Sequence, residues 1–208
     1  MSKLAAIGGA SASGKSTAYC QVEVDKLKIE GLDPKETFIL NVASKELPAL
    51  GMAKIYNDLG HIYNGSDYAG IFKAITSKIL PGIKKGKIKN IVLEDAQYLM
   101  SLDFFERRND AGFTKFAKIG FSFLELLVKL KKLPGVYVFV LLHTEINSEG
   151  QDIGVKTIGR MLDEKFTLEG LWTTVLIAQK DFNRAKKTME YKFRTAPAYK
   201  DDIAKSPL

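Results

Sequence analysis

Short apolar runs alternate along most of the chain with segments whose apolar residues have helical spacing. The largely apolar runs are residues 4–7, 37–42, 88–93 and 136–142. Runs of this kind, with little polar alternation, are typical of strands that are covered on both faces, as in a parallel sheet. We therefore expect an α/β fold in which a mostly parallel sheet is flanked by helices.

Three helices are predicted between these strands. The first follows residues 9–17 and ends at Gly31, the second is capped by Asp67 and stopped by Pro81 and Gly82, and the third runs to Pro134. Their apolar positions are Cys20, Val24 and Leu27 in the first, Tyr68, Ile71, Phe72, Ile75 and Ile79 in the second, and Phe116, Ile119, Gly120, Phe123, Leu127 and Leu130 in the third. Each set recurs at the spacing of one helix face.

The remaining segments are predicted to be turns, loops and a hairpin. Residues 43–48 are expected to form a turn at the edge of the site, residues 54–64 an irregular insertion, and residues 147–154 a polar mobile loop. Residues 171–177 and 189–195 both favour strands, so they predict a β-hairpin near the end of the chain.

Length and composition narrow the class of protein. A chain of 208 residues, 46% hydrophobic and 26% charged, fits one globular domain over residues 1–208, and it has no apolar stretch long enough to predict a membrane span. The N-terminus does not resemble a secretory signal, and the single Cys20 cannot form an internal disulfide. We therefore expect a cytoplasmic protein that binds no membrane. The net charge of +7 makes a polyanionic partner plausible.

The chemistry begins with a match to G-x-x-x-x-G-K-[ST] directly after the first strand. The matching residues, with the one that follows, are Gly9, Ala10, Ser11, Ala12, Ser13, Gly14, Lys15, Ser16 and Thr17. In such a loop the backbone N–H groups cradle phosphates and the glycines allow the tight backbone. Lys15 is expected to reach the β- and γ-phosphates of ATP, and Ser16 to bind Mg²⁺.

Two further strands end in polar side chains. Glu94 and Asp95 follow residues 88–93, which is where a nucleotide hydrolase needs one acid for Mg²⁺ and one for the attacking water. We assign Glu94 to the metal and its water shell and Asp95 to the water, with the reverse order left open; both are candidate metal-site residues. His143 follows residues 136–142 and is the candidate sensor of the γ-phosphate.

The motifs together resemble a family of small phage-encoded ATPases with a RecA-like fold. The resemblance covers nearly the whole chain and rests on residues 9–17, 38–42 with Lys45 and 47–48, 93–98, 143–145, 156–165 and 204–207. It implies that the strand before His143 lies between the loop strand and the acidic strand. The family often has two aspartates where this chain has Glu94 and Asp95, and its members usually continue beyond the terminal Lys-Ser-Pro, which here is residues 205–207.

By this resemblance some members act beside single-strand-binding or annealing proteins in phage recombination. The leading hypothesis is an Mg²⁺-dependent ATPase of phage DNA metabolism, located in the host cytoplasm, that assembles as a homo-oligomer on single-stranded DNA. Residues 9–17, the acidic pair and His143 include no arginine, so a neighbouring subunit is expected to complete the site with Arg160, Lys156 or Lys205. The alternatives are a nucleotide kinase and a regulatory module that binds ATP without hydrolysing it.

Overall fold

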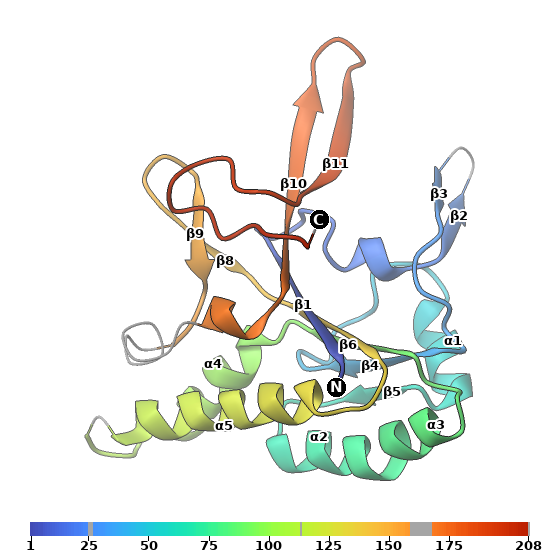
Figure 1. Cartoon of the computed structure of the whole chain (residues 1–208), viewed down its shortest axis with the longest axis vertical. Helices are drawn as coiled ribbons and strands as arrows, with labels where there is room; N and C mark the ends of the chain where they lie inside the picture. Colours follow the sequence, from blue (N-terminus) through green and yellow to red (C-terminus); the bar gives the residue numbers. More distant parts are fainter. Residues whose placement is uncertain (25–26, 113, 159–167, 208) are drawn as a thin grey trace.

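The computed structural model describes residues 1–24, 27–112, 114–158 and 168–207 (Figure 1). Its main element is a seven-stranded sheet in the order β11-β10-β1-β7-β6-β4-β5. The strands are β1 (Lys3–Gly8), β4 (Thr37–Asn41), β5 (Ile62–Asn64), β6 (Asn90–Glu94), β7 (Tyr137–Leu141), β10 (Thr174–Asn183) and β11 (Thr188–Arg194). All neighbouring pairs are parallel except β10 and β11, which form an antiparallel hairpin. The predicted α/β fold, with a mostly parallel sheet and a C-terminal hairpin, is therefore confirmed.

Helices cover this sheet on both faces. They are α1 (Met52–Leu59), α2 (Tyr68–Ala74), the π-helical η2 (Ile75–Ile79), α3 (Leu80–Lys84), α4 (Gln97–Glu106) and α5 (Thr114–Lys131). Figure 1 shows α2, α3, α4 and α5 gathered on one side of the molecule, while the β10–β11 hairpin projects away from them. Within the described ranges, no helix combines the length and the apolar character that crossing a lipid bilayer requires.

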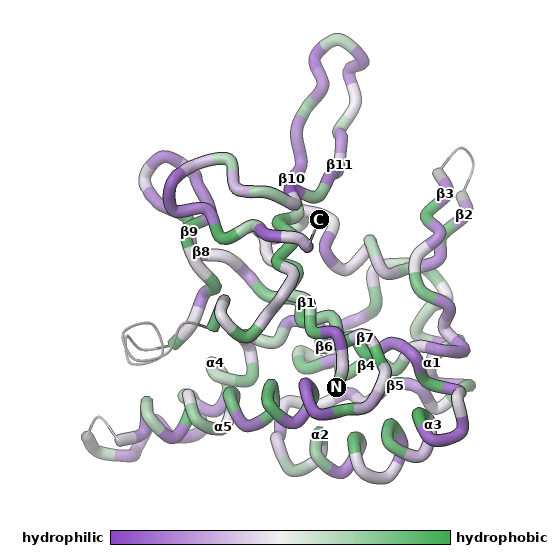
Figure 2. The backbone as a smooth tube through the Cα atoms, viewed as in Figure 1, coloured by the Kyte–Doolittle hydropathy of each residue, from purple (hydrophilic) through white to green (hydrophobic). Residues whose placement is uncertain are grey.

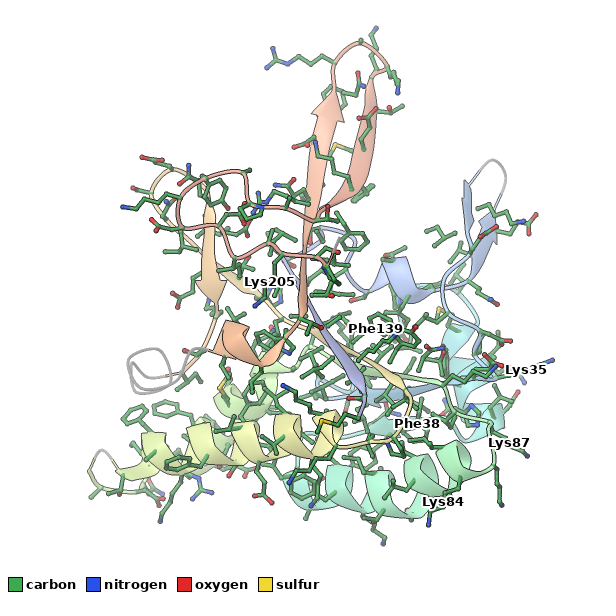
Figure 3. All side chains as sticks on the ribbon, in the orientation of Figure 1. Lys35, Phe38, Lys84, Lys87, Phe139 and Lys205 are labelled. Carbon is green, nitrogen blue, oxygen red and sulfur yellow. The ribbon has the colours of Figure 1, made fainter. Side chains whose placement is uncertain are left out.

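Alternate residues of each central strand pack on opposite faces of the sheet, because side chains of a strand alternate in direction. Leu40 and Leu93 belong to the larger core, with α2 and α5, whereas Ile39 and Val92 belong to a smaller core with α1 and Cys20. In Figure 3, Phe38 and Phe139 both lie among the packed side chains of the sheet region, and Figure 2 shows the central strands as largely hydrophobic. Burial on both faces explains why these strands are apolar without alternation.

The helix predicted after residues 9–17 is wrong. The chain there forms a 3-10 turn, η1 (Thr17–Tyr19), and then two antiparallel strands, β2 (Val22–Val24) and β3 (Leu27–Ile29). The prediction rested on Cys20, Val24 and Leu27, but Val22, Val24, Leu27 and Ile29 also alternate with charged residues. Valine and isoleucine are stiff at χ1 and fit strands better than helices, so the period of two prevails.

The irregular insertion predicted over residues 54–64 is also wrong, because α1 and β5 occupy most of it. Met52 and Tyr56 are one helical turn apart and are both buried, and Gly60 ends the helix with a left-handed backbone. Both features are helix signals.

Pro81 does not stop the second predicted helix, which continues through η2 and α3 to Lys84. Pro81 occupies the first turn of α3, where its missing N–H costs little. Part of the predicted loop over residues 147–154 is strand, because β8 (Thr144–Ile146) pairs with β9 (Asp152–Val155). The strand predicted at residue 171 starts at Thr174, after the 3-10 turn η3 (Leu168–Leu171).

Candidate functional site

The candidate site lies at the carboxyl ends of β1, β4, β6 and β7, the edge of a parallel sheet where ligands bind in open α/β folds. Residues 9–17 follow β1 directly. Lys15 of this loop is buried, and its Nζ donates hydrogen bonds to the carbonyl oxygens of Gly9 at 2.8 Å and Ala10 at 2.7 Å. Burial lowers the pKa of Lys15, although the negative charges of Asp95 and Glu94 act in the opposite direction. The Lys15 ammonium is thus held by two carbonyl groups of its own loop.

Two glycines allow the loop its shape. Gly9 has φ +145°, and a Cβ there would lie 2.6 Å from the carbonyl oxygen of Ala178 on β10. Gly14 has φ +91°, and a Cβ there would lie 3.1 Å from the ring of Tyr191 on β11. The loop is therefore closely packed against the C-terminal hairpin.

The two acids at the end of β6 have different surroundings. Glu94 is the last residue of β6 and is buried, and the hydroxyl of Ser16 donates a hydrogen bond to its Oε1. Its Oε2 is buried with no hydrogen-bond partner among the described residues, and burial raises the pKa of this carboxyl. Asp95 follows with a left-handed backbone, φ +55°, and lines the cavity beside the loop. A left-handed backbone at a residue other than glycine costs about 1–3 kcal/mol and is typical of functional sites.

Lys45 is a residue of the resemblance to which sequence reasoning assigned no role. It lies in the turn after β4, and its Nζ is 2.5 Å from Oδ2 of Asp95 and 3.5 Å from Oε1 of Glu94. Burial acts to lower the pKa of Lys45, but the hydrogen bond and charge of Asp95 outweigh it and raise that pKa. The lysine is therefore charged at neutral pH. The position of Lys45 in the sequence could have indicated a role, because Lys45 comes shortly after a buried strand, as the two acids and His143 do.

His143 lies beyond the end of β7, and the sheet order puts β7 between β1 and β6, as the resemblance implies. Its backbone N–H donates to Oε1 of Gln97 at 3.3 Å, and its ring is edge-on to Tyr98. Burial and then the positive charge of Lys15 lower the pKa of His143, so its imidazole is neutral at physiological pH. A neutral imidazole can donate one hydrogen bond and accept another.

One cavity of about 340 Å³ joins most of these groups. Residues 11–17 form one wall, and Lys45, Asp95 and His143 line the rest of it together with Tyr98. Glu94 is not among the lining residues, but Ser16, which is, donates a hydrogen bond to it. The structure thus places the residues predicted from separate strands around one space.

The three residues predicted to act across a subunit boundary have different positions. Lys156 lines an adjoining cavity of about 260 Å³ with Gln97 and His143 of the same chain, and its N–H donates to the carbonyl of His143 at 2.9 Å. The backbone of Lys205 pairs with Val175 on β10, and Figure 3 shows Lys205 beside that strand. Arg160 lies outside the described residues.

The donors at the end of β6 suit magnesium. A carboxylate oxygen and a hydroxyl are hard ligands; Oε1 of Glu94 accepts the hydrogen bond of Ser16, and Oε2 of the same carboxylate has no hydrogen-bond partner among the described residues. In the described part of the chain, no three His, Cys, Asp or Glu side chains are grouped to hold a metal on their own. Magnesium bound with nucleotide needs only one or two carboxylates, because substrate phosphates supply other ligands.

No protein-family model matches the chain, and no curated protein matches it in sequence. Among solved structures, the fold is similar to that of the KaiC-like protein PH0186 from the hyperthermophilic archaeon Pyrococcus horikoshii OT3. The TM-score is 0.53 and the identity 15%, and the similarity covers 92% of this chain and 78% of that chain. At this identity the likeness concerns the fold. The chain therefore has a RecA-like α/β fold, and residues 9–17, from here on called the P-loop, lie at the carboxyl end of β1.

Proposed function

We propose that the protein binds and hydrolyses ATP with Mg²⁺, and that it acts in phage DNA metabolism. The observation that carries the ATPase proposal is the set of groups around one cavity: Lys15 on the loop, the pair of Ser16 and Glu94, and Asp95 held by Lys45. Phosphoryl transfer requires little covalent help from a protein, so its catalysis depends on positioning and charge stabilisation. The lysines supply positive charge, and the hydroxyl and the two carboxylates supply metal-binding and water-orienting oxygens, which are the groups that such catalysis uses.

Each side chain has a role that follows from its position. Ser16 and Glu94 would hold Mg²⁺, which when bound supplies positive charge to the phosphate oxygens. Asp95 faces the cavity and would orient the attacking water, which favours the first of the two assignments considered for the acids. Lys15 and Lys45 would stabilise the negative charge of the transition state. Lys45 is thus a candidate within this chain for part of the positive charge that was expected from a neighbouring subunit.

The test of hydrolysis is phosphate release from ATP with and without Mg²⁺. We expect Mg²⁺-dependent turnover in the wild type and none in Lys15→Ala. Lys54→Ala, on the exposed surface of α1, serves as the control and should retain turnover. ATP binding without any turnover in the wild type would instead indicate a regulatory module. Phosphate transfer to a nucleoside or nucleoside monophosphate would indicate a kinase.

The DNA part of the proposal is supported by charge and by the resemblance. The net charge is +7, and Figure 3 shows Lys84 and Lys87 near the end of α3 and Lys35 on the same side of the molecule, nearer α1. We propose single-stranded DNA as the partner, with a homo-oligomer whose assembly depends on nucleotide, and a phage single-strand-binding or annealing protein beside it in the host cytoplasm. Neutralising phosphates with lysines makes affinity fall as salt rises.

These partners are tested by measuring DNA binding, turnover and particle mass over a series of salt concentrations. We expect binding that weakens with salt, faster hydrolysis with DNA, and a larger particle when ATP is present. Turnover that DNA does not change, together with no salt-dependent binding, would contradict the DNA proposal and leave the ATPase proposal standing.

A further inference from the structure

A second cavity lies against the P-loop on the side of the C-terminal hairpin. Its volume is about 700 Å³, and its walls include Ala12, Gly14 and Ala18 from the loop side and Met189, Tyr191 and Phe193 from β11. This volume is within the range of small-molecule sites, about 300–1,000 Å³. Nothing in the hydrolysis scheme uses the three side chains of β11.

The two cavities meet along the loop, because residues 12–14 and Thr17 line both of them. Their chemistry differs sharply. The first has Lys15, Lys45 and Asp95 in its walls, whereas the second is formed mainly by apolar and aromatic side chains. A ligand that fills both spaces must therefore be highly charged at one end and flat or apolar at the other.

The hairpin presents a wall of one methionine and two aromatic side chains to this second cavity. Met189, Tyr191 and Phe193 are alternate residues of one strand, so they share a face, and all three are exposed. The ring of Tyr191 lies so close to the loop that a Cβ at Gly14 would be 3.1 Å from its Cδ1. The wall is thus fixed directly beside the residues that would hold phosphates.

We propose that this wall, with Tyr191 at its centre, stacks on the base of the nucleotide whose phosphates the P-loop holds. The proposal rests on the proposed function, because it assumes that a nucleotide occupies the loop. A nucleoside triphosphate has the charged end and the flat aromatic end that the two cavities require. Every base has a π-face, so stacking on tyrosine accepts different bases and favours the larger surface of purines.

The experiment compares two ligands, ATP and inorganic tripolyphosphate, which has the phosphates without the base. Their dissociation constants are measured by calorimetry, with Mg²⁺, for the wild type, Tyr191→Ala and Tyr191→Phe. Phe182→Ala is the matched control, since Phe182 is a similarly exposed aromatic of the same hairpin (58% against 61% for Tyr191) and is not among the residues lining the cavity.

In Tyr191→Ala we expect ATP to bind about 5- to 150-fold more weakly, the fold-change that corresponds to losing one base–aromatic stack. Tripolyphosphate binding should not change, Tyr191→Phe should bind ATP as the wild type does, and Phe182→Ala should leave both ligands unaffected. Circular dichroism of each variant checks the fold.

Three results would overturn the proposal. Equal loss of both ligands in Tyr191→Ala would mean that the ring orders the loop and does not contact a base. Unchanged ATP affinity in that variant would mean that the base lies elsewhere. A wild type that binds tripolyphosphate as tightly as ATP would have a phosphate site without a base subsite, whereas a wild type that binds neither ligand would contradict the proposed function itself.

Discussion

Replacing Lys45 with methionine tests how the charges of the site are balanced. The substitution keeps the length of the side chain and removes its charge, which lies 2.5 Å from Asp95 Oδ2. At that distance Coulomb's law gives about 1.7 kcal/mol in water and about 6.6 kcal/mol at an effective dielectric constant of 20. The lysine side chain is 46% exposed and that of Asp95 only 6%, so a value near the lower end applies. We expect Lys45→Met to lower the free energy of unfolding by about 2 kcal/mol at pH 8, which is about 4–8 °C in Tm.

The loss should depend on pH with a definite sign. Burial raises the pKa of Glu94 above its unfolded value, and the charge of Lys45 opposes this rise. Without Lys45 the pKa of Glu94 rises further, so the folded variant takes up a proton more readily than the unfolded chain. A raised carboxyl pKa costs stability as pH increases through and above the unfolded value of about 4.3. The part of the deficit that comes from Glu94 should therefore be absent near pH 4.5 and grow toward pH 8, so that the whole deficit is larger at pH 8.

Thermal unfolding of the nucleotide-free protein at both pH values measures this deficit. Lys54→Met is the matched control, because Lys54 pairs with Asp58 at 2.6 Å but both side chains are exposed, 80% and 63%. An exposed pair contributes little to stability, so this control should unfold close to the wild type. A deficit in Lys45→Met that is absent at pH 8, or equal at both pH values, would refute the reasoning.

Three other predictions concern single residues of the site and the smaller core. Asp95→Asn should keep ATP affinity and lower kcat by about 10²- to 10³-fold, as expected for a group that acts in the transition state; full turnover in this variant would remove Asp95 from the mechanism. Burial raises the pKa of Cys20 to about 12, so iodoacetamide at pH 8 should label the thiol only after unfolding, and rapid labelling of the native protein would contradict its packing. Because burial lowers the pKa of His143, the wild type should lose stability as pH falls below the unfolded value of about 6.5; urea unfolding at pH 7.5 and 5.5 should show a smaller loss in His143→Gln, and identical losses would place His143 in solvent.

Much of the architecture could be predicted from local patterns. The strands at residues 37–42, 88–93 and 136–142 were predictable because burial on both faces removes the polar alternation from a strand. The P-loop follows a recognisable spacing, and Glu94, Asp95 and His143 each come directly after an apolar run. Carboxyl ends of parallel strands share one edge of a sheet, so these side chains were expected near one another. What they do chemically stays a prediction that the experiments above address.

Errors arose where one local pattern supported two periods. Val24 and Leu27 fit a helix when taken with Cys20, and they fit paired strands when taken with Val22 and Ile29. The period of apolar residues over so short a segment does not decide between them. The observed strands depend on pairing between β2 and β3, which is a contact between segments and is not a property of either one.

The sequence by itself determined the central strands of the sheet, the P-loop and the identity of the acids, because each depends on neighbours along the chain. Only the tertiary structure decided that Lys45 pairs with Asp95 and that Tyr191 lies over Gly14. These partners are far apart in sequence, and no spacing rule connects them. They meet because the sheet order places β4 beside β6, and because β10 pairs with β1 while the hairpin brings Tyr191 of β11 back next to the loop.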